Sequence, residues 1–382
     1  MIYLDNGATS FPKPPQVADA VYNYIMNVGG NINRGNGSGA LSASETVLET
    51  RELLNKMMNG YGARNTIFTP GNTYSLNFFI KGLAEKGDTF LTSMTEHNAV
   101  YRPLSQLEKE GKISVKYMPC TKEGKLITEE ALNMINENIK AVILLHASNV
   151  SGSIMPIEEI GKRCREKGVI FIVDAAQTAG NTEIDIQKCC IDGLAFPAHK
   201  SMLAPQGLGV MMINPKIKDK IRVLVAGGTG SHSELSEMPN ELPDRFESGT
   251  LNIPAIFGLN ASCKWLAKNM KKASENEKKL SEKLIEGLKN INNVEIAGIP
   301  STEGRVSVIS INFTNEDNAL AAFKLEKDYG ITTRVGLHCA PLAHKSLGTY
   351  PGGTVRFSIG PFNTIEDIDT VLAAVKEIAE NK

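Results

Sequence analysis

Three side chains that can form covalent bonds or move protons lie just after apolar segments of this 382-residue sequence: His97, Asp174 and Lys200. Asp174 follows the apolar run 169–173, and a carboxylate buried there needs a cationic or hydrogen-bonding partner. Lys200 could form a Schiff base if it is partly buried, because its amine must become neutral to attack a carbonyl. His97 could shuttle protons. Taken singly, Asp174 or His97 could equally be a helix cap, and Lys200 a surface lysine.

The segment 68–73, with the sequence Phe-Thr-Pro-Gly-Asn-Thr, is typical of a strand that turns into a helix. Gly71 permits close approach of the backbone to a ligand. Thr73, together with the free amides of a helix N-terminus, could bind a phosphate. A simple helix cap is the alternative interpretation of Thr73.

Short apolar segments alternate with amphipathic segments up to Asn252. The predicted strands are 66–69, 89–92, 141–146, 169–173 and 209–213, and the predicted helices include 75–83, 99–108 and 156–167. This alternation predicts an α/β fold with a mainly parallel sheet and helices on both faces. Ligands of such sheets bind at the carboxyl ends of strands, where the polar residues described above are expected.

Beyond Asn252 the pattern changes. A long helix is predicted from Ile253 to about Leu288, and strands are predicted near 294 and at 306–313. A helix at about 318–328, a strand at 355–359 and a final helix at about 365–380 follow. We interpret this region as a smaller α+β domain that the long helix links to the first.

The bulk properties exclude several classes of protein. Lys and Arg number 41 against 42 Asp and Glu, a net charge of -1, which argues against nucleic-acid or anionic-membrane partners. No apolar run approaches the ~20 residues of a membrane span, and the N-terminus resembles no secretion signal, so we expect a cytoplasmic protein. The six cysteines lack the spacing of a disulfide framework or a zinc site, so we expect no metal.

Five motifs, in order along nearly the whole chain, resemble the class V aminotransferase superfamily of fold-type I pyridoxal-phosphate enzymes. They are Leu4-Asp5-Asn6-Gly7-Ala8-Thr9, Thr95-Glu96-His97-Asn98, Val173-Asp174-Ala175-Ala176-Gln177, Ala198-His199-Lys200 and Phe246-Glu247-Ser248-Gly249-Thr250. The resemblance implies a large cofactor-binding domain at 16–255 with a mainly parallel seven-stranded sheet. It also implies a linking helix and small α+β domain at 256–382, and an N-terminal segment, 1–15, that packs with the small domain.

The resemblance implies roles for individual residues. Lys200 would form the Schiff base with pyridoxal 5'-phosphate, and Asp174 would pair with the ring nitrogen. His97 would stack on the ring and act as a general acid–base group. Gln177 would reach the phenolic oxygen of the ring. The family works as a homodimer with shared active sites.

The phosphate contacts implied by the resemblance come from Thr73 and His199, and from Thr250 of the neighbouring subunit. One departure affects them. Similar enzymes usually have Ser-Gly before the His-Lys pair, whereas this chain has Pro197-Ala198. We therefore expect one hydroxyl ligand of the phosphate to be missing, with Asn72 as a candidate to rebuild the site.

The segment from Thr333 to Pro341 resembles the short catalytic loop of group II cysteine desulfurases and selenocysteine lyases. Cys339 falls on their persulfide-forming cysteine. A desulfurase must offer a thiolate to the substrate sulfur, and nearby cations favour the thiolate. Arg334 and His338 are the candidate cations. An inert thiol is the alternative for an isolated cysteine.

Arg356 lies near the end of a predicted strand, and a guanidinium can grip a carboxylate with two hydrogen bonds. The resemblance makes it the residue that binds the substrate α-carboxylate, whereas a surface ion pair is the ordinary alternative. Asn149 matches a position beside cofactor and substrate. Arg334 would also face the substrate, and Arg34 matches an arginine that the dimer partner supplies in relatives.

These features predict a cysteine desulfurase that releases L-alanine from L-cysteine and leaves a persulfide on Cys339 for an acceptor protein. Three alternatives stay open. The substrate could be L-selenocysteine, the reaction could be that of an aminotransferase or β-lyase of the same fold, or the protein could be a cofactor-free scaffold. The set of Lys200, Asp174 and His97 argues against the scaffold.

Overall fold

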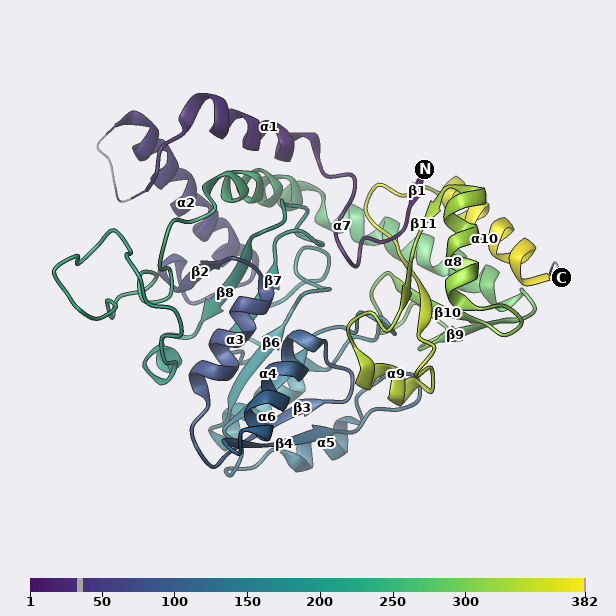
Figure 1. Cartoon of the computed structure of the whole chain (residues 1–382), viewed down its shortest axis with the longest axis horizontal. Helices are drawn as coiled ribbons and strands as arrows, with labels where there is room; N and C mark the ends of the chain where they lie inside the picture. Colours follow the sequence, from purple (N-terminus) through teal and green to yellow (C-terminus); the bar gives the residue numbers. More distant parts are fainter. Residues whose placement is uncertain (33–36, 381–382) are drawn as a thin grey trace.

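The large sheet organises the first part of the chain. The structure is a computed structural model that describes residues 1–32 and 37–380. Within those residues, seven strands form one sheet in the order β2-β8-β7-β6-β5-β3-β4 (Figure 1). The strands are β2 (Thr66–Thr69), β3 (Asp88–Ser93), β4 (Ile113–Met118), β5 (Ala141–Leu145), β6 (Ile170–Asp174), β7 (Gly193–Pro197) and β8 (Gly209–Ile213). All pairs from β7 to β4 are parallel, and β8 is antiparallel to both β7 and β2. The prediction of a mainly parallel seven-stranded sheet is confirmed.

Helices cover both faces of this sheet because successive side chains of a strand point to opposite sides. Ile143 and Ile172 pack with α3 (Asn72–Leu83) and α4 (Asn98–Lys109). Leu144 and Val173 belong to the core on the other face. That core includes residues of α2 (Ser38–Met57), α5 (Thr128–Met134) and α6 (Ile157–Lys167). Both faces are therefore dry, and polar side chains gather at the ends of the strands.

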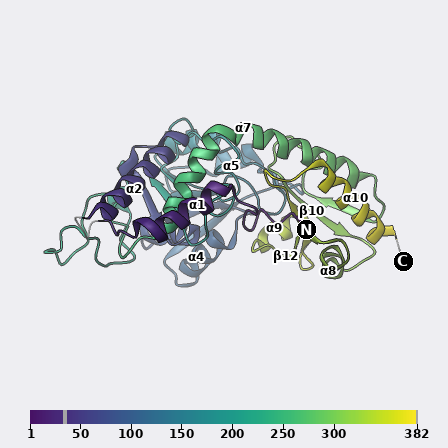
Figure 2. The same cartoon turned by 90° about the horizontal axis from the view of Figure 1, so that it is seen from above.

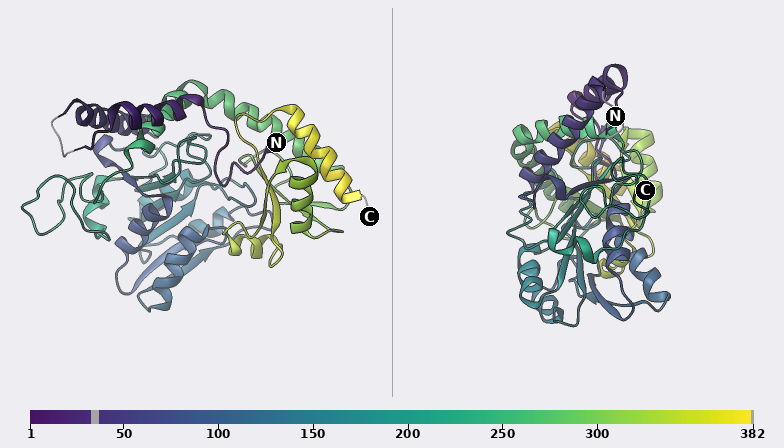
Figure 3. Two further views of the ribbon diagram at one scale, coloured as in Figure 1. Left: turned by 45° about the horizontal axis from the view of Figure 1, so that its top comes forward. Right: turned by 90° about the vertical axis from the view of Figure 1, so that its left-hand side faces the viewer.

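A second, antiparallel sheet has its own core. Its order is β12-β13-β10-β9, and the strands are β9 (Val294–Ala297), β10 (Val308–Phe313), β12 (Arg334–Gly336) and β13 (Thr354–Ser358). Helices α8 (Asn318–Tyr329) and α10 (Ile365–Glu380) contribute to this core. The N-terminal strand β1 (Ile2–Tyr3) pairs in parallel with β11 (Ile331–Thr332), so the chain begins beside this sheet (Figure 3).

One helix joins the two cores. Helix α7 (Ile253–Lys289) has 37 residues and runs along the length of the molecule (Figure 2). Its residues from Ile253 to Leu266 pack in the core of the large sheet, and those from Leu280 to Leu288 pack in the core of the small one. The predicted long helix is confirmed almost to the residue. A boundary between residues 255 and 256 would pass through its first turn.

The remaining elements are short or peripheral: α1 (Pro15–Asn23), η1 (Tyr24–Val28), η2 (Ala63–Asn65), η3 (Pro215–Lys220) and α9 (Pro341–Leu347). Helix α1 packs on α7, so the chain crosses from the small sheet to the large part between β1 and α1. Among the described residues, no helix combines the length and the apolar character needed to cross a bilayer.

Candidate active site

A cavity of about 460 Å³ lies where the carboxyl ends of β5, β6 and β7 meet the small sheet. The predicted site residues that line it are Asn72, Thr73, His97, Asn149, Asp174, Gln177, His199, Lys200, Arg334, Cys339 and Arg356. Two predicted residues are not among them. Thr250 lines a neighbouring pocket of about 250 Å³, and Arg34 lies outside the described residues.

Asp174 is the last residue of β6, and its carboxyl is buried. Its Oδ1 accepts hydrogen bonds from Asn72 Nδ2 at 2.8 Å and from the Ala176 amide at 3.0 Å. Burial raises the pKa of Asp174, while the bond from Asn72 and the charge of Lys200 oppose that rise. The first of these bonds orients Asp174 through the side-chain nitrogen of Asn72, while the phosphate contact expected of Asn72 stays a prediction.

Lys200 follows β7 by three residues and faces the same cavity. Burial lowers the pKa of its ammonium group to about 8, and the positive charge of Arg356 adds to the effect. Asp174 works in the opposite direction. A substantial fraction of the amine is therefore neutral near physiological pH, as a nucleophilic lysine requires.

His97 both caps a helix and lines the cavity, so the two interpretations of this residue hold together. Its Nδ1 accepts a hydrogen bond from the Ala99 amide at 3.0 Å at the start of α4. Burial, followed by the charges of Lys200 and Arg334, lowers the pKa of His97 to about 4. The ring is thus neutral, and its proton is assigned to Nε2 because Nδ1 is an acceptor.

The loop before His97 is held by a residue to which sequence reasoning gave no role. Glu96 is buried, and its Oε1 accepts hydrogen bonds from Ser93 Oγ at 2.7 Å and from the Leu145 amide at 3.1 Å. Burial raises the pKa of Glu96 to about 8, so the carboxyl is largely protonated at pH 7. The sequence offered one indication of a role for Glu96, namely its position in the motif Thr95-Glu96-His97-Asn98.

The end of the cavity that is predicted to bind a phosphate has fewer side-chain hydrogen-bond donors than the resemblance implies. Thr73 is exposed, and Pro197 lines the wall without contributing a hydroxyl. His199 Nδ1 is buried and has no hydrogen-bond partner within the described residues. This nitrogen is free to contact a ligand, whereas the Asn72 amide is already engaged by Asp174.

Cys339 is an exposed residue in the loop after β12, and it lines the same cavity as Lys200. Two consecutive residues, His338 with φ 47° and Cys339 with φ 58°, adopt the left-handed conformation that is uncommon outside glycine. Two hydrogen bonds fix them: Asn149 Nδ2 donates to the His338 carbonyl at 2.7 Å, and the Asn98 amide donates to the Cys339 carbonyl at 2.7 Å. Strain of this kind is common at functional sites.

His338 does not supply positive charge to this loop. Its ring is buried, and Nε2 contacts Thr354 Oγ1 at 3.0 Å. Burial, with the charge of Arg356, lowers the pKa of His338 to about 2, so the ring is neutral. The prediction of His338 as a cation beside Cys339 is therefore wrong, and Arg334 is left as the predicted cation that shares the cavity.

Arg356 lies on β13 and is only 2% exposed. Its Nη2 pairs with Asp5 Oδ1 at 2.7 Å, and its Nη1 donates to the Asn149 carbonyl at 3.1 Å. The surface ion pair considered from the sequence does not describe this buried group. Asp5 belongs to one of the five motifs, but the sequence did not indicate its contact with Arg356, which lies 351 positions away.

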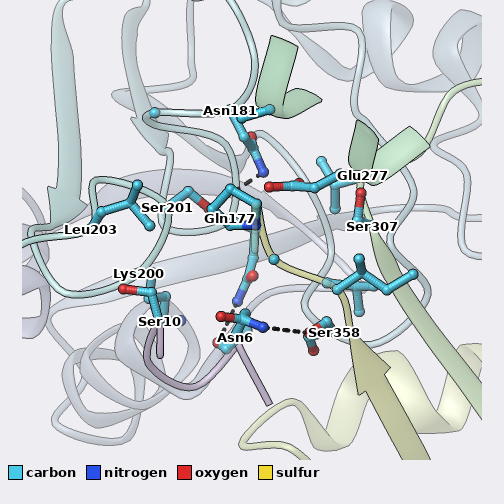
Figure 4. Close-up of a pocket in the computed structure, with 18 of the residues that line it drawn as sticks. Asn6, Ser10, Gln177, Asn181, Lys200, Ser201, Leu203, Glu277, Ser307 and Ser358 are labelled. Carbon is cyan, nitrogen blue, oxygen red and sulfur yellow. Dashed lines mark hydrogen bonds between the residues drawn. The ribbon is translucent and has the colours of Figure 1, made fainter. Parts of the chain in front are cut away.

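A smaller cavity, of about 30 Å³, lies behind Lys200 and Gln177, toward α7 (Figure 4). Its volume suits about one or two water molecules. Gln177 Nε2 donates to the Gly7 carbonyl at 3.1 Å. Glu277 of α7 faces this cavity, and burial raises the pKa of its carboxyl to about 8.

Comparisons with known proteins agree over the full length. The model of the family Aminotransferase class-V matches residues 2–371. A probable cysteine desulfurase of Pyrococcus abyssi (strain GE5 / Orsay) is 33% identical, over 100% of this chain and 95% of that protein. A second, from Methanothermobacter thermautotrophicus, is 30% identical over 99% of this chain and 94% of that protein.

A solved structure gives the same relationship in three dimensions. The apo cysteine desulfurase from Thermococcus onnurineus NA1 matches with a TM-score of 0.92 at 30% identity, covering 100% of this chain and 95% of that one. Sequence, fold and cavity thus point to one family. The chain belongs to the class V aminotransferases.

Proposed function

We propose that this chain is a pyridoxal-phosphate-dependent cysteine desulfurase that converts L-cysteine to L-alanine and leaves a persulfide on Cys339. The observation that carries the proposal is a shared cavity, which the exposed residue Cys339 lines together with Lys200 and Arg356. The similar proteins named above are cysteine desulfurases or probable cysteine desulfurases, which agrees with this reaction.

Pyridoxal 5'-phosphate fits the residues of this cavity. The volume of about 460 Å³ is in the range of cofactor sites. Asp174 offers a buried carboxyl to a ring nitrogen, Lys200 offers an amine of lowered pKa, and His199 Nδ1 is buried without a partner in the described chain. The bound cofactor would supply an electron sink for a substrate amino acid.

Each polar residue then has a defined task. Lys200 Nζ would hold the cofactor and would carry the proton that leaves the substrate α-carbon. The Asp174 carboxyl would pair with the ring nitrogen of the bound cofactor, and Asn72 holds Asp174 in place. The neutral ring of His97 can donate or accept a proton at Nε2 beside the substrate. Arg356 binds the substrate α-carboxylate.

Cys339 accepts the sulfur atom of the substrate. Its thiolate attacks the substrate sulfur, forming a sulfur–sulfur bond on Cys339 Sγ. The bond between the substrate Cβ and sulfur breaks, and its electron pair stays with the carbon fragment. Protonation of that fragment at Cβ, with return of the proton from Lys200 Nζ to the α-carbon, then yields L-alanine. Cys339 requires an exposed position for the next transfer, which would pass the sulfur to an acceptor protein.

A homodimer with shared active sites belongs to the same proposal. Thr250 is exposed and does not line the large cavity of its own chain. Large apolar side chains are exposed on α1, η1 and α2, three elements that pack on one another or on α7: Tyr22, Ile25, Met26, Leu41 and Leu48. Exposed apolar side chains gathered in this way are typical of a protein–protein interface.

The test is the variant Cys339→Ser. We expect alanine release from L-cysteine to fall by roughly a hundredfold or more, because the acceptor of the sulfur is lost. Mass spectrometry should find a persulfide on Cys339 of the wild type after incubation with L-cysteine, and none on the variant. The matched control is Cys120→Ser. Burial raises the pKa of Cys120 to about 11, so its thiol stays protonated and its loss should leave activity intact.

Two outcomes would point to the alternative reactions. Transamination that persists in Cys339→Ser, with no persulfide in the wild type, would identify an aminotransferase and refute the proposal. Alanine release from L-selenocysteine that persists in the variant, while release from L-cysteine is lost, would identify an additional lyase activity, because a selenolate leaves more readily than a thiolate.

A further inference from the structure

The N-terminal strap, defined here as residues 5–13, touches both halves of the active site. Asp5 forms a β-bridge with Ser358 of the small sheet. Farther along, the His199 carbonyl accepts hydrogen bonds from the Ser10 amide at 2.9 Å and from Thr9 Oγ1 at 3.2 Å. Figure 4 shows Asn6 and Ser10 of this strap in the same view as Lys200, Gln177 and Ser358. The strap therefore connects the strand of Arg356 with the peptide that carries Lys200.

Asp5 makes the only ion pair of Arg356 among the described residues, with Nη2 and Oδ1 2.7 Å apart. A guanidinium carries five N–H donors. Asp5 engages Nη2 and the Asn149 carbonyl engages Nη1, while Nε is buried and has no hydrogen-bond partner within residues 1–32 and 37–380. Enough donors remain for a carboxylate to bind with two hydrogen bonds.

The strap leaves the guanidinium little room to move. A Cβ atom added to Gly7 would lie 3.3 Å from Arg356 Cζ and 2.7 Å from Ser358 Oγ. The backbone at Gly7 thus packs directly against the arginine head group. On the neighbouring strand, Arg334 is the residue paired with Arg356 in the antiparallel register, so a second cation stands beside it. Without a carboxylate nearby, the two like charges would repel each other.

We infer that Asp5 is a positioning residue that holds Arg356 with its free N–H groups toward the cavity, and thereby sets the affinity for the substrate α-carboxylate. The inference rests on the proposed role of Arg356 in substrate binding. Asp5 fixes the guanidinium from the side of the strap, and the Asn149 carbonyl fixes it from the side of the large sheet. Recognition of the carboxylate then costs little reorganisation.

The experiment compares Asp5→Ala with the wild-type holoenzyme. The KM for L-cysteine is expected to rise roughly 10- to 100-fold, the effect of losing a hydrogen bond between charged groups, while kcat changes much less. The inhibition constant of 2-aminoethanethiol, which has the amine and thiol of cysteine but no carboxylate, should not change. A general disruption of the site would weaken both ligands together.

Asp5→Asn is the conservative variant, because its amide oxygen can still accept the bond from Nη2. Its KM should lie between those of wild type and Asp5→Ala, and it decides the question if Asp5→Ala does not fold. Asp19→Ala, at an exposed position on α1, is the matched control and should keep the wild-type KM.

The outcomes separate this inference from the function on which it rests. Wild-type protein that releases no alanine from L-cysteine would refute the proposed function. An active wild type, with the KM for L-cysteine unchanged in both Asp5 variants, would overturn the inference alone. The inference would also be overturned if the KM for L-cysteine and the inhibition constant of 2-aminoethanethiol rose together in the Asp5 variants.

Discussion

Lys200 lies among charges of both signs, and burial decides its behaviour. The pKa of its ammonium group falls from 10.5 to about 8 because burial and Arg356 outweigh Asp174. A lowered pKa means that the nucleophilic, neutral amine appears at a lower pH than in an exposed lysine. In this protein, about half of the amine should be neutral near pH 8, and nearly all of it about one pH unit higher.

Attachment of pyridoxal 5'-phosphate to the apoenzyme should therefore accelerate with pH through about pH 8 and level off about one pH unit higher. The measurement traps the attached cofactor with borohydride and quantifies the mass increase at Lys200. Nα-acetyl-lysine, treated in parallel, gives the profile of an ordinary lysine with the same cofactor. A rate at Lys200 that rises roughly tenfold between about pH 9 and 10, as the rate of Nα-acetyl-lysine does, would contradict the lowered pKa.

Lys200, Asp174 and His97 could be identified from the sequence because each lies in a recognisable motif, and Asp174 and His97 also follow predicted strands. The partners of these residues could not. Asp5 and Arg356 lie 351 positions apart, and nothing local to either residue indicates the pair. The neutral state of His338 depends on its burial, which no spacing of residues encodes. The hydrogen bond from Asn72, at the start of α3, to Asp174, at the end of β6, likewise joins residues 102 positions apart.

At the scale of elements, the turn between β2 and α3 is shaped by β8. A Cβ atom added to Gly209 would collide with the carbonyl carbon of Gly71 and would lie 2.7 Å from the backbone nitrogen of Asn72. The strand can approach the turn this closely only because residue 209 has no side chain. The same turn begins the helix that is proposed to hold the phosphate.

Gly209→Ala should push this turn out of position and weaken binding of pyridoxal 5'-phosphate roughly tenfold, the equivalent of a modest overpacking penalty. A fluorescence titration of the apoprotein measures the dissociation constant. Gly352→Ala is the matched control, because a Cβ there meets nothing within 4 Å. Equal dissociation constants for the two variants would show that β8 does not shape the cofactor site.

Most elements with strong local patterns were predicted well, although strand β4, which contains Ile113 and Val115, was not among the predicted strands. The strands at 66–69 and 209–213 and the helix from Ile253 have the expected bounds, because β-branched runs and helical periodicity mark them. Strand β7 was not among the predicted strands. Its sequence, Gly-Leu-Ala-Phe-Pro, has no β-branched residue and gains its structure from pairing with β6 and β8.

At the scale of the whole molecule, shared active sites predict that two inactive variants can regain activity when their chains form mixed dimers. Lys200→Ala should be inactive because the cofactor amine is gone. Thr250→Asp should be inactive if Thr250 approaches the phosphate in the partner's site, since a carboxylate would repel it. In a mixed dimer, one site combines Lys200 of one chain with Thr250 of the other, and both are intact.

Co-refolding the two inactive variants should therefore restore activity, to at most about a quarter of the wild-type level if chains pair at random. Light scattering should give a mass twice the 41.4 kDa of one chain. Each variant refolded alone is the control. A monomeric mass, a mixture that remains inactive, or a Thr250→Asp variant that is active when refolded alone would refute the shared site.

The overall architecture was predicted largely through the five motifs that resemble a known family, because their order along the chain fixes the order of the strands that carry them. Alternation of apolar segments by itself indicated only an α/β fold with a second domain. The limits of the domains at 16–255 and 256–382 stay a prediction. Helix α7 belongs to both cores and offers no natural cut between them.

That helix also acts as a lever arm. At 1.5 Å per residue, its 37 residues extend over about 55 Å, with one end in each core. A bend of about 5° near its middle would swing the far end by roughly 2 Å, and with it the sheet that carries Arg356 and leads to Cys339. A small bend of this one helix would therefore change the distance between Cys339 Sγ and the sulfur of the substrate.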